Sequence, residues 1–152
     1  MMRVMVVEDE EMIRKGIVMA VDWAALDCVV VGEAANGEQA LAVAEECRPT
    51  LIITDLKMPK MDGLEMVRRL REAGSRAYVI ILTAYDSFAY AQTAIRLGAV
   101  DFLLKPFHDG DLENAVLALQ KRIAAQAAPQ PEPLPGVKPG PKSRYVRETM
   151  VY

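Results

Sequence analysis

The chain has 152 residues, enough for one domain with a buried core, and its composition of 52% hydrophobic and 26% charged residues is typical of a soluble globular protein. No apolar run approaches the roughly 18 residues of a membrane span, and no signal peptide precedes the first apolar segment, so we expect a cytoplasmic protein that does not contact a membrane. The net charge is −3, and residues 1–128 carry 14 basic and 19 acidic side chains, which leaves no basic surface for nucleic-acid binding in that part.

Five apolar segments alternate with helical patterns over residues 1–126. The segments are rich in Val, Ile and Leu, as expected for parallel strands that are covered by helices on both faces. The predicted strands are residues 3–7, 28–34, 51–54, 78–82 and 100–104. The second strand is less purely apolar, which indicates a position at the edge of the sheet.

Helical periodicity marks the segments between the strands. Apolar residues recur three and four positions apart in the first, third and fifth helical segments. They are Ile13, Ile17, Ala20 and Val21, then Leu64, Val67 and Leu70, then Leu112, Ala115, Val116, Leu119 and Ile123. On the third helix, Arg68, Arg69 and Arg71 are expected to face away from the core. Residues that cap helix starts precede the second to fifth helices: Asn36, Asp62, Asp86 with Ser87, and Asp109. The alternation predicts an α/β fold with a doubly wound parallel sheet and helices on both faces.

Reactive polar residues stand where four of these strands stop. The first strand stops on Glu8 and Asp9, the third on Asp55, the fourth on Thr83 and the fifth on Lys105. Ligands of such sheets bind outside the carboxyl ends of the strands, so three carboxylates, a hydroxyl and an ammonium should meet in one crevice. An aspartate alone at a strand end is more often a turn or capping residue, but four such endings in order favour a site.

The chemistry of this crevice suits a cation and a phosphoryl group. Two like charges 4 Å apart repel by roughly 4 kcal/mol at an effective dielectric near 20, so clustered carboxylates favour a bound cation. Hard oxygen ligands suit Mg²⁺, or Mn²⁺ in its place. The carboxylate of Asp55 is the best nucleophile candidate and can form an aspartyl phosphate, while Lys105 supplies charge and Thr83 a donor.

The composition changes after Ala128. Six of the nine prolines lie between Pro129 and Pro141, which predicts an extended, semi-rigid linker over residues 127–142. Residues 143–152 have the spacing of an amphipathic helix and are interpreted as the possible start of a truncated helical output domain. A disordered tail is the alternative interpretation.

Four segments resemble the receiver domain of two-component response regulators. They are Val6-Val7-Glu8-Asp9-Glu10, Ile53-Thr54-Asp55-Leu56-Lys57-Met58-Pro59-Lys60-Met61-Asp62-Gly63, Ile81-Leu82-Thr83-Ala84 and Phe102-Leu103-Leu104-Lys105-Pro106-Phe107. The resemblance covers residues 2–126 and implies a flavodoxin-like, five-stranded sheet with strand order 2-1-3-4-5. It also implies that a sensor histidine kinase donates a phosphoryl group to Asp55. Glu8, Asp9 and Asp55 would hold the metal ion, with the backbone carbonyl of Lys57 as a further ligand.

The resemblance assigns roles to the ends of the last two strands as well. Thr83, Ala84 and Lys105 would contact the phosphoryl group, and Thr83 with Phe102 would form the switch pair. A cis bond is implied before Pro106. On phosphorylation, the face of the fourth helix, fifth strand and fifth helix would change and favour a partner or a homodimer.

Two positions are expected to set the lifetime of the aspartyl phosphate. Lys57 and Tyr85 would flank the phosphoryl group, and the Tyr85 ring would shield it from water. With these two residues beside it, the phosphoryl group is expected to be accepted and then lost slowly, so the protein would not act as an enzyme with steady turnover. In this resemblance Glu8 stands where aspartate is commoner.

A narrower resemblance points to receivers that are joined to AraC-type DNA-binding domains. It rests on Asp22-Trp23, Gly32-Glu33-Ala34-Ala35-Asn36-Gly37 and Ala84-Tyr85-Asp86-Ser87-Phe88-Ala89-Tyr90-Ala91. It implies transcription regulation, with DNA bound only through an output domain beyond this chain. A stand-alone receiver that acts through protein contacts is the alternative.

Two further readings of the same crevice are weaker. A magnesium-dependent phosphatase with an aspartate nucleophile needs a second acid two residues later, where this chain has Lys57. A flavin carrier of the same architecture needs a Gly/Ser/Thr-rich phosphate loop after the first strand, which is absent. Cys28 and Cys47 form no CxxC pair and are expected to be reduced, buried thiols.

Overall fold

A computed structural model describes residues 1–84, 88–96, 98, 101–105 and 110–127. The chain divides into two units, Met1–Ala115 and Val116–Tyr152. The predicted capping residues Asp86, Ser87 and Asp109 lie outside the described residues, as do residues 128–152 of the predicted linker and tail. Among the helices that the structure describes, none has the length and apolar character needed to cross a membrane.

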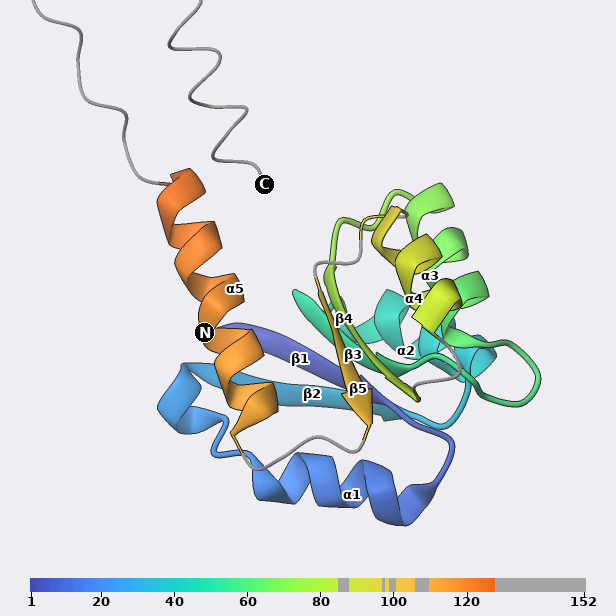
Figure 1. Cartoon of the computed structure of the whole chain (residues 1–152), viewed down its shortest axis with the longest axis horizontal. Helices are drawn as coiled ribbons and strands as arrows, with labels where there is room; N and C mark the ends of the chain where they lie inside the picture. Colours follow the sequence, from blue (N-terminus) through green and yellow to red (C-terminus); the bar gives the residue numbers. More distant parts are fainter. Residues whose placement is uncertain (85–87, 97, 99–100, 106–109, 128–152) are drawn as a thin grey trace, which may run out of the picture. The chain divides into compact units, whose positions relative to one another are not determined.

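Five parallel strands form one sheet in the order β2-β1-β3-β4-β5. The strands are β1 (Met2–Val7), β2 (Cys28–Ala34), β3 (Leu51–Asp55), β4 (Tyr78–Ala84) and β5 (Asp101–Lys105). The flavodoxin-like strand order and the edge position of the second strand are therefore confirmed. Because the strands are parallel, their carboxyl ends lie along one edge of the sheet (Figure 1).

Helices lie on both faces of this sheet, as predicted. The α-helices of the chain are α1 (Glu11–Ala20), α2 (Gly37–Cys47), α3 (Gly63–Glu72), α4 (Phe88–Arg96) and α5 (Asp111–Ala127), and a short 3-10 helix lies at Ala24–Leu26. Figure 1 shows α1 on one face and α2, α3 and α4 on the opposite face. The sequence pattern predicted the five α-helices but not the 3-10 helix.

The central strands are buried on both faces, which explains their near-continuous apolar sequences. Every residue of Val4–Val7, Leu51–Thr54 and Val79–Leu82 is 0% exposed. Full burial of one such aliphatic side chain contributes about 1.5–3 kcal/mol relative to leaving it in water. The predicted core residues Val67 and Leu70 of α3 are buried in one apolar cluster with residues of β1, β3 and β4.

The buried stripe of α1 is narrower than predicted. Ile17 and Val21 are buried, but Ile13 is 39% exposed and Ala20 is also exposed. The spacing of apolar residues identified the helix correctly, but it could not show that only part of the predicted stripe is buried.

Arg71 corrects the prediction that all three arginines of α3 face away from the core. Arg68 and Arg69 are exposed, whereas Arg71 is partly buried. Its Nη1 donates to the Ser75 carbonyl at 3.0 Å and its Nη2 to the Gly98 carbonyl at 3.1 Å. Burial lowers the pKa of the Arg71 guanidinium from its usual value. These two carbonyls belong to loops, so the helical periodicity of the sequence cannot predict them as partners of Arg71.

Two helix starts have the predicted side-chain caps. Asn36 Oδ1 accepts a hydrogen bond from the Gln39 amide at 2.9 Å at the start of α2. Asp62 Oδ1 accepts one from the Glu65 amide at 2.8 Å at the start of α3. Each cap satisfies a backbone donor that the helix itself leaves without a partner, and it is worth about 1 kcal/mol.

Gly63 lets α3 begin directly against the end of β3. A Cβ atom at this position would stand 2.3 Å from the carbonyl oxygen of Asp55, closer than real Cβ atoms approach any backbone atom. The Gly63 amide donates to the Leu56 carbonyl at 2.8 Å. The absence of a side chain at Gly63 therefore sets the path of the chain that carries Asp55.

Replacing Gly63 with alanine should lower the free energy of unfolding by about 1–3 kcal/mol, because the overpacked methyl group forces backbone apart. Gly16 is the matched control, since it lies inside α1 and a Cβ there meets nothing within 4 Å. Gly16→Ala should raise stability by about 0.5–1 kcal/mol. Urea denaturation followed by circular dichroism measures both, and equal effects of the two substitutions would contradict the close contact.

Candidate functional site

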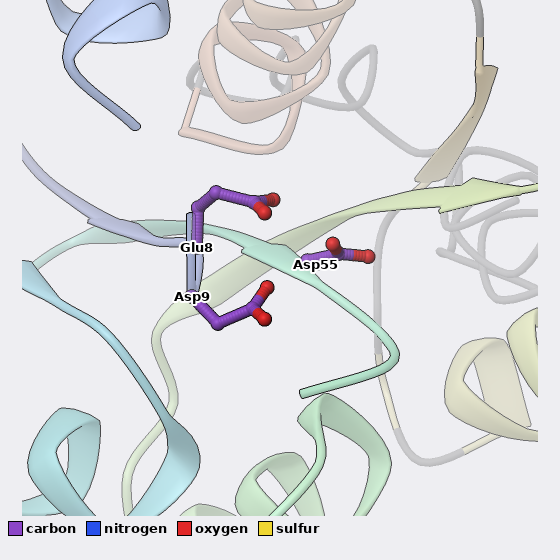
Figure 2. A group of neighbouring side chains, drawn as sticks. All are labelled: Glu8, Asp9 and Asp55. Atoms are coloured by element: carbon purple, nitrogen blue, oxygen red, sulfur yellow. The ribbon is translucent and has the colours of Figure 1, made fainter. Parts of the chain in front are cut away.

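Three acidic residues stand at the carboxyl ends of the neighbouring strands β1 and β3. β1 ends at Val7, so Glu8 and Asp9 follow it directly, and Asp55 is the last residue of β3. The strand register pairs Val7 with Thr54, which places Glu8 and Asp55 at the same level of the sheet edge. One carboxylate oxygen from each of Glu8, Asp9 and Asp55 lies within 4.8 Å of the other two. Figure 2 shows the Glu8 and Asp9 side chains extending toward the side on which Asp55 lies.

The three carboxylates differ in their access to water. Glu8 is only 1% exposed, whereas neither Asp9 nor Asp55 is buried. The Leu56 amide donates to Asp55 Oδ1 at 2.7 Å and so orients this carboxylate. A buried carboxylate beside two others is unfavourable without a compensating positive charge. The donor set of clustered, partly accessible carboxylate oxygens therefore fits a hard divalent cation.

The ends of β4 and β5 reach the same edge. Asp55 pairs with Leu82, the residue before Thr83, and Ala84 pairs with Lys105. The structure describes the backbone of these strands but not the side chains of Thr83, Ala84, Phe102 and Lys105. The strand order brings together all four predicted strand endings at the level of the backbone.

The remaining predicted site residues lie beyond the strand ends. Lys57 is exposed in the loop after β3, two residues after Asp55. Tyr85 and Pro106 lie outside the described residues. Their predicted roles in phosphate lifetime and in a cis bond stay predictions.

Arg14 and Glu33 belong to the surroundings of the acidic cluster, but the sequence did not reveal them. Arg14 Nη1 donates to the backbone carbonyl of Glu8 at 2.8 Å, and Arg14 Nε donates to Glu33 Oε1 at 3.2 Å. The one available signal is a charged residue inside an apolar strand, since Glu33 lies in β2. Nothing in the sequence pattern pairs it with a residue of α1.

A second group of charges, on α3, is a solvent-exposed ion-pair network and not a site. Arg68 and then Arg69, by their hydrogen bonds to Glu65, hold the pKa of that carboxyl at about 2. Exposed pairs of this kind contribute little to stability, because water and salt screen them.

Both cysteines are free, as expected, but only one is buried. Cys28 is buried, and burial raises the pKa of its thiol above the usual value. Cys47 is partly exposed, which corrects the prediction that both thiols are buried. Neither cysteine joins the acidic cluster.

The fold and the site together define a flavodoxin-like α/β protein with a cluster of three acidic residues at the carboxyl edge of its sheet. The family model of the response regulator receiver domain matches residues 4–117. The receiver domain of AraT, a response regulator from Geobacillus stearothermophilus, is 38% identical; the match covers 84% of this chain and 98% of that chain, with a TM-score of 0.76. A two-component transcriptional regulator AraC from Clostridium phytofermentans is 28% identical over 84% of this chain and 100% of its own, with a TM-score of 0.74.

The chain belongs to the response regulator receiver domain family. It is a receiver domain of two-component response regulators and is related to transcriptional regulators. Among curated proteins, the uncharacterised transcriptional regulatory protein YesN of Bacillus subtilis is 31% identical over 124 residues, which cover 82% of this chain and 33% of that protein. The chain spans about a third of the length of this relative and about half of the length of others that it matches.

Relief of charge repulsion gives the acidic cluster a measurable signature. In metal-free buffer with a chelator, Asp9→Asn should raise the free energy of unfolding by about 1 kcal/mol, the repulsion of two charges at 4 Å in water. Addition of MgCl₂ should then stabilise the unmodified protein more than the variant, because a ligand of the folded state stabilises it by mass action. Thermal denaturation under both conditions measures the two effects.

Glu46→Gln is the control for this measurement, since Glu46 is an exposed carboxylate on α2 outside the cluster. It should leave the response to MgCl₂ unchanged. Two results would show that the three carboxylates do not act as one cation site. One is that Asp9→Asn is less stable than the unmodified protein in the presence of chelator. The other is that MgCl₂ stabilises Asp9→Asn as much as the unmodified protein.

Proposed function

We propose that this receiver accepts a phosphoryl group on Asp55 from a sensor histidine kinase. The observation that carries the proposal is the convergence of three carboxylates within 4.8 Å at the sheet edge of a receiver-family chain. Among them, Asp55 ends a central strand and is not buried, so a phosphoryl donor has access to it.

Glu8, Asp9 and Asp55, with the backbone carbonyl of Lys57, are the proposed ligands of Mg²⁺ or Mn²⁺. The carboxylate oxygens within 4.8 Å of one another supply the hard donors that such an ion prefers. When bound, the ion would offset the negative charge of the phosphoryl oxygens. Glu8 is buried, so it would be the least solvent-accessible of the three carboxylate ligands.

The chain's own residues carry the proposed transfer. A carboxylate oxygen of Asp55 forms the new bond to phosphorus as the bond between phosphorus and the kinase histidine nitrogen breaks. The Leu56 amide, 2.7 Å from Asp55 Oδ1, fixes the orientation of the attacking carboxylate. Lys105 would pair with a phosphoryl oxygen, and the Thr83 hydroxyl and the Ala84 amide would donate to others.

The proposed output is a shift between two conformations. Thr83 would move to the phosphoryl group, and the Phe102 ring would fill the space that it leaves. Adjacent strands carry the two residues, since Phe102 pairs with Ile81, two positions before Thr83. The face of the fourth helix, fifth strand and fifth helix would then favour a homodimer or another partner.

A transcriptional role and a cytoplasmic location complete the proposal. YesN and the AraC regulator are named as transcriptional regulators, and YesN is three times as long as its matched part. We propose that residues 127–142 link the receiver to an output domain that begins near residue 143 and binds DNA. Asp55 is followed two positions later by Lys57 rather than by an acid, which favours slow autodephosphorylation over enzymatic turnover.

Incubation with acetyl phosphate and MgCl₂ should add one phosphoryl group to the protein, and Asp55→Asn should abolish the addition. Asp62→Asn is the matched control, because Asp62 lies in the same loop region and asparagine caps α3 equally well. Intact-mass spectrometry measures both variants. Absence of the adduct in the unmodified protein, or its persistence in Asp55→Asn, would overturn the assignment.

Tyr85→Ala should shorten the lifetime of the aspartyl phosphate several-fold, because water would reach the phosphorus more easily. The decay of the phosphorylated protein after removal of acetyl phosphate measures this lifetime. Tyr85→Phe keeps the ring and should retain the slow decay. An unchanged rate in Tyr85→Ala would exclude a shielding role for the ring.

A further inference from the structure

Glu8 is held at both of its backbone groups by neighbouring elements. Its amide donates to the Ala34 carbonyl at 3.0 Å, and its carbonyl accepts from Arg14 Nη1 at 2.8 Å. The same guanidinium donates through Nε to Glu33 Oε1 at 3.2 Å. Glu33 and Ala34 are consecutive in β2, so these bonds close a ring from Glu8 through Arg14 back to the end of the edge strand.

Arg14 is shielded from water in this ring. Its side chain is 13% exposed, and that of Glu33 is 27% exposed. Ion pairs of this burial are screened less by salt than pairs at the surface. The guanidinium therefore has a defined position beside the acidic cluster, because its planar fork contacts a carbonyl and a carboxylate at once.

The positive charge of Arg14 lies close to the carboxylates that would bind the metal ion, and Glu33 offsets this charge. A cation bonded to the backbone of Glu8 would compete with a metal ion for the carboxylates of Glu8 and Asp9. Glu33 offsets this charge and draws the guanidinium toward β2. Arg14 then bonds the main chain of Glu8, and the fixed backbone directs the Glu8 and Asp9 side chains toward Asp55.

We propose that Arg14 and Glu33 form a positioning pair that preorganises Glu8 and Asp9 for Mg²⁺. This inference rests on the proposed function only for the identity of the ion. Neither residue touches the ion; Arg14 acts through the carbonyl of Glu8, and Glu33 acts through Arg14. Substitution of groups that orient metal ligands typically weakens metal affinity by about 10–100-fold.

Isothermal titration of the whole chain with MgCl₂, without a phosphoryl donor, tests the pair. Arg14→Ala should weaken Mg²⁺ binding about tenfold, because Glu8 and Asp9 lose their fixed direction. A purely electrostatic effect predicts the opposite, since removal of a neighbouring positive charge would tighten binding. Arg14→Lys keeps the charge but lacks the fork, so it should not restore the affinity.

Glu33→Gln gives a second, independent test of the positioning pair. The substitution keeps the size of the side chain but leaves Arg14 without its carboxylate partner, so Mg²⁺ affinity should fall. In the double variant Arg14→Ala with Glu33→Gln, the loss should match that of Arg14→Ala alone, because Glu33 acts only through Arg14. Circular dichroism confirms that each variant is folded; if Arg14→Ala does not fold, Glu33→Gln and Arg14→Lys decide.

Lys15→Ala is the matched control. Lys15 Nζ also lies 3.2 Å from Glu33 Oε1, but the side chain is 51% exposed and has no bond to Glu8 among the described contacts. Its removal should leave Mg²⁺ affinity unchanged. Equal losses in Lys15→Ala and Arg14→Ala, or unchanged affinity in Arg14→Ala and Glu33→Gln, would overturn the pair. Mg²⁺ binding without acetyl phosphate labelling would refute the proposed function and leave this inference intact.

Discussion

The mutual repulsion of three carboxylates is the constraint around which this end of the molecule is built. Charge repulsion opposes the close approach of Glu8, Asp9 and Asp55, because like charges at such distances destabilise the folded state. They stay within 4.8 Å because they stand at the carboxyl ends of the neighbouring parallel strands β1 and β3. The apolar burial of β1, β3 and β4 thus supplies the free energy that holds a charged cluster together.

The backbone around the cluster gives the acids little freedom to move apart. Gly63 brings the start of α3 against the Asp55 carbonyl, and the Leu56 amide holds the Asp55 carboxylate. On the other side, Ala34 and Arg14 hold the amide and carbonyl of Glu8. A site held in this way would be organised before a cation binds, so little of the binding free energy would be spent on ordering the ligands.

The sequence predicted those parts of the site that depend on strand endings, and it failed where tertiary contacts decide. Glu8, Asp9 and Asp55 were found because apolar runs stop at them and parallel strands end at one edge. Arg14 was not found, because its partners are a backbone carbonyl and a residue of another element. The fold was also predictable from the apolar residues, because their periodicity reflects which side chains are buried against the sheet. The motifs of the receiver family assigned Lys57 and Phe102, which periodicity alone would have left as a loop residue and a core residue.

In the proposed mechanism, the strand order separates the part of the site that would bind the ion from the part that would respond to phosphorylation. Glu33 lies in β2, Arg14 lies in α1, and the acids stand at the ends of β1 and β3, whereas β4 and β5 carry Thr83 and Phe102. Asp55 pairs with Leu82 on β4, so a phosphoryl group on Asp55 would arrive beside the residue that follows, Thr83. If the proposed switch operates, a displacement at Thr83 would pass to β5 more completely when the acids themselves do not move. On this proposal, the ring around Glu8 and the switch on β4 and β5 would serve one mechanism.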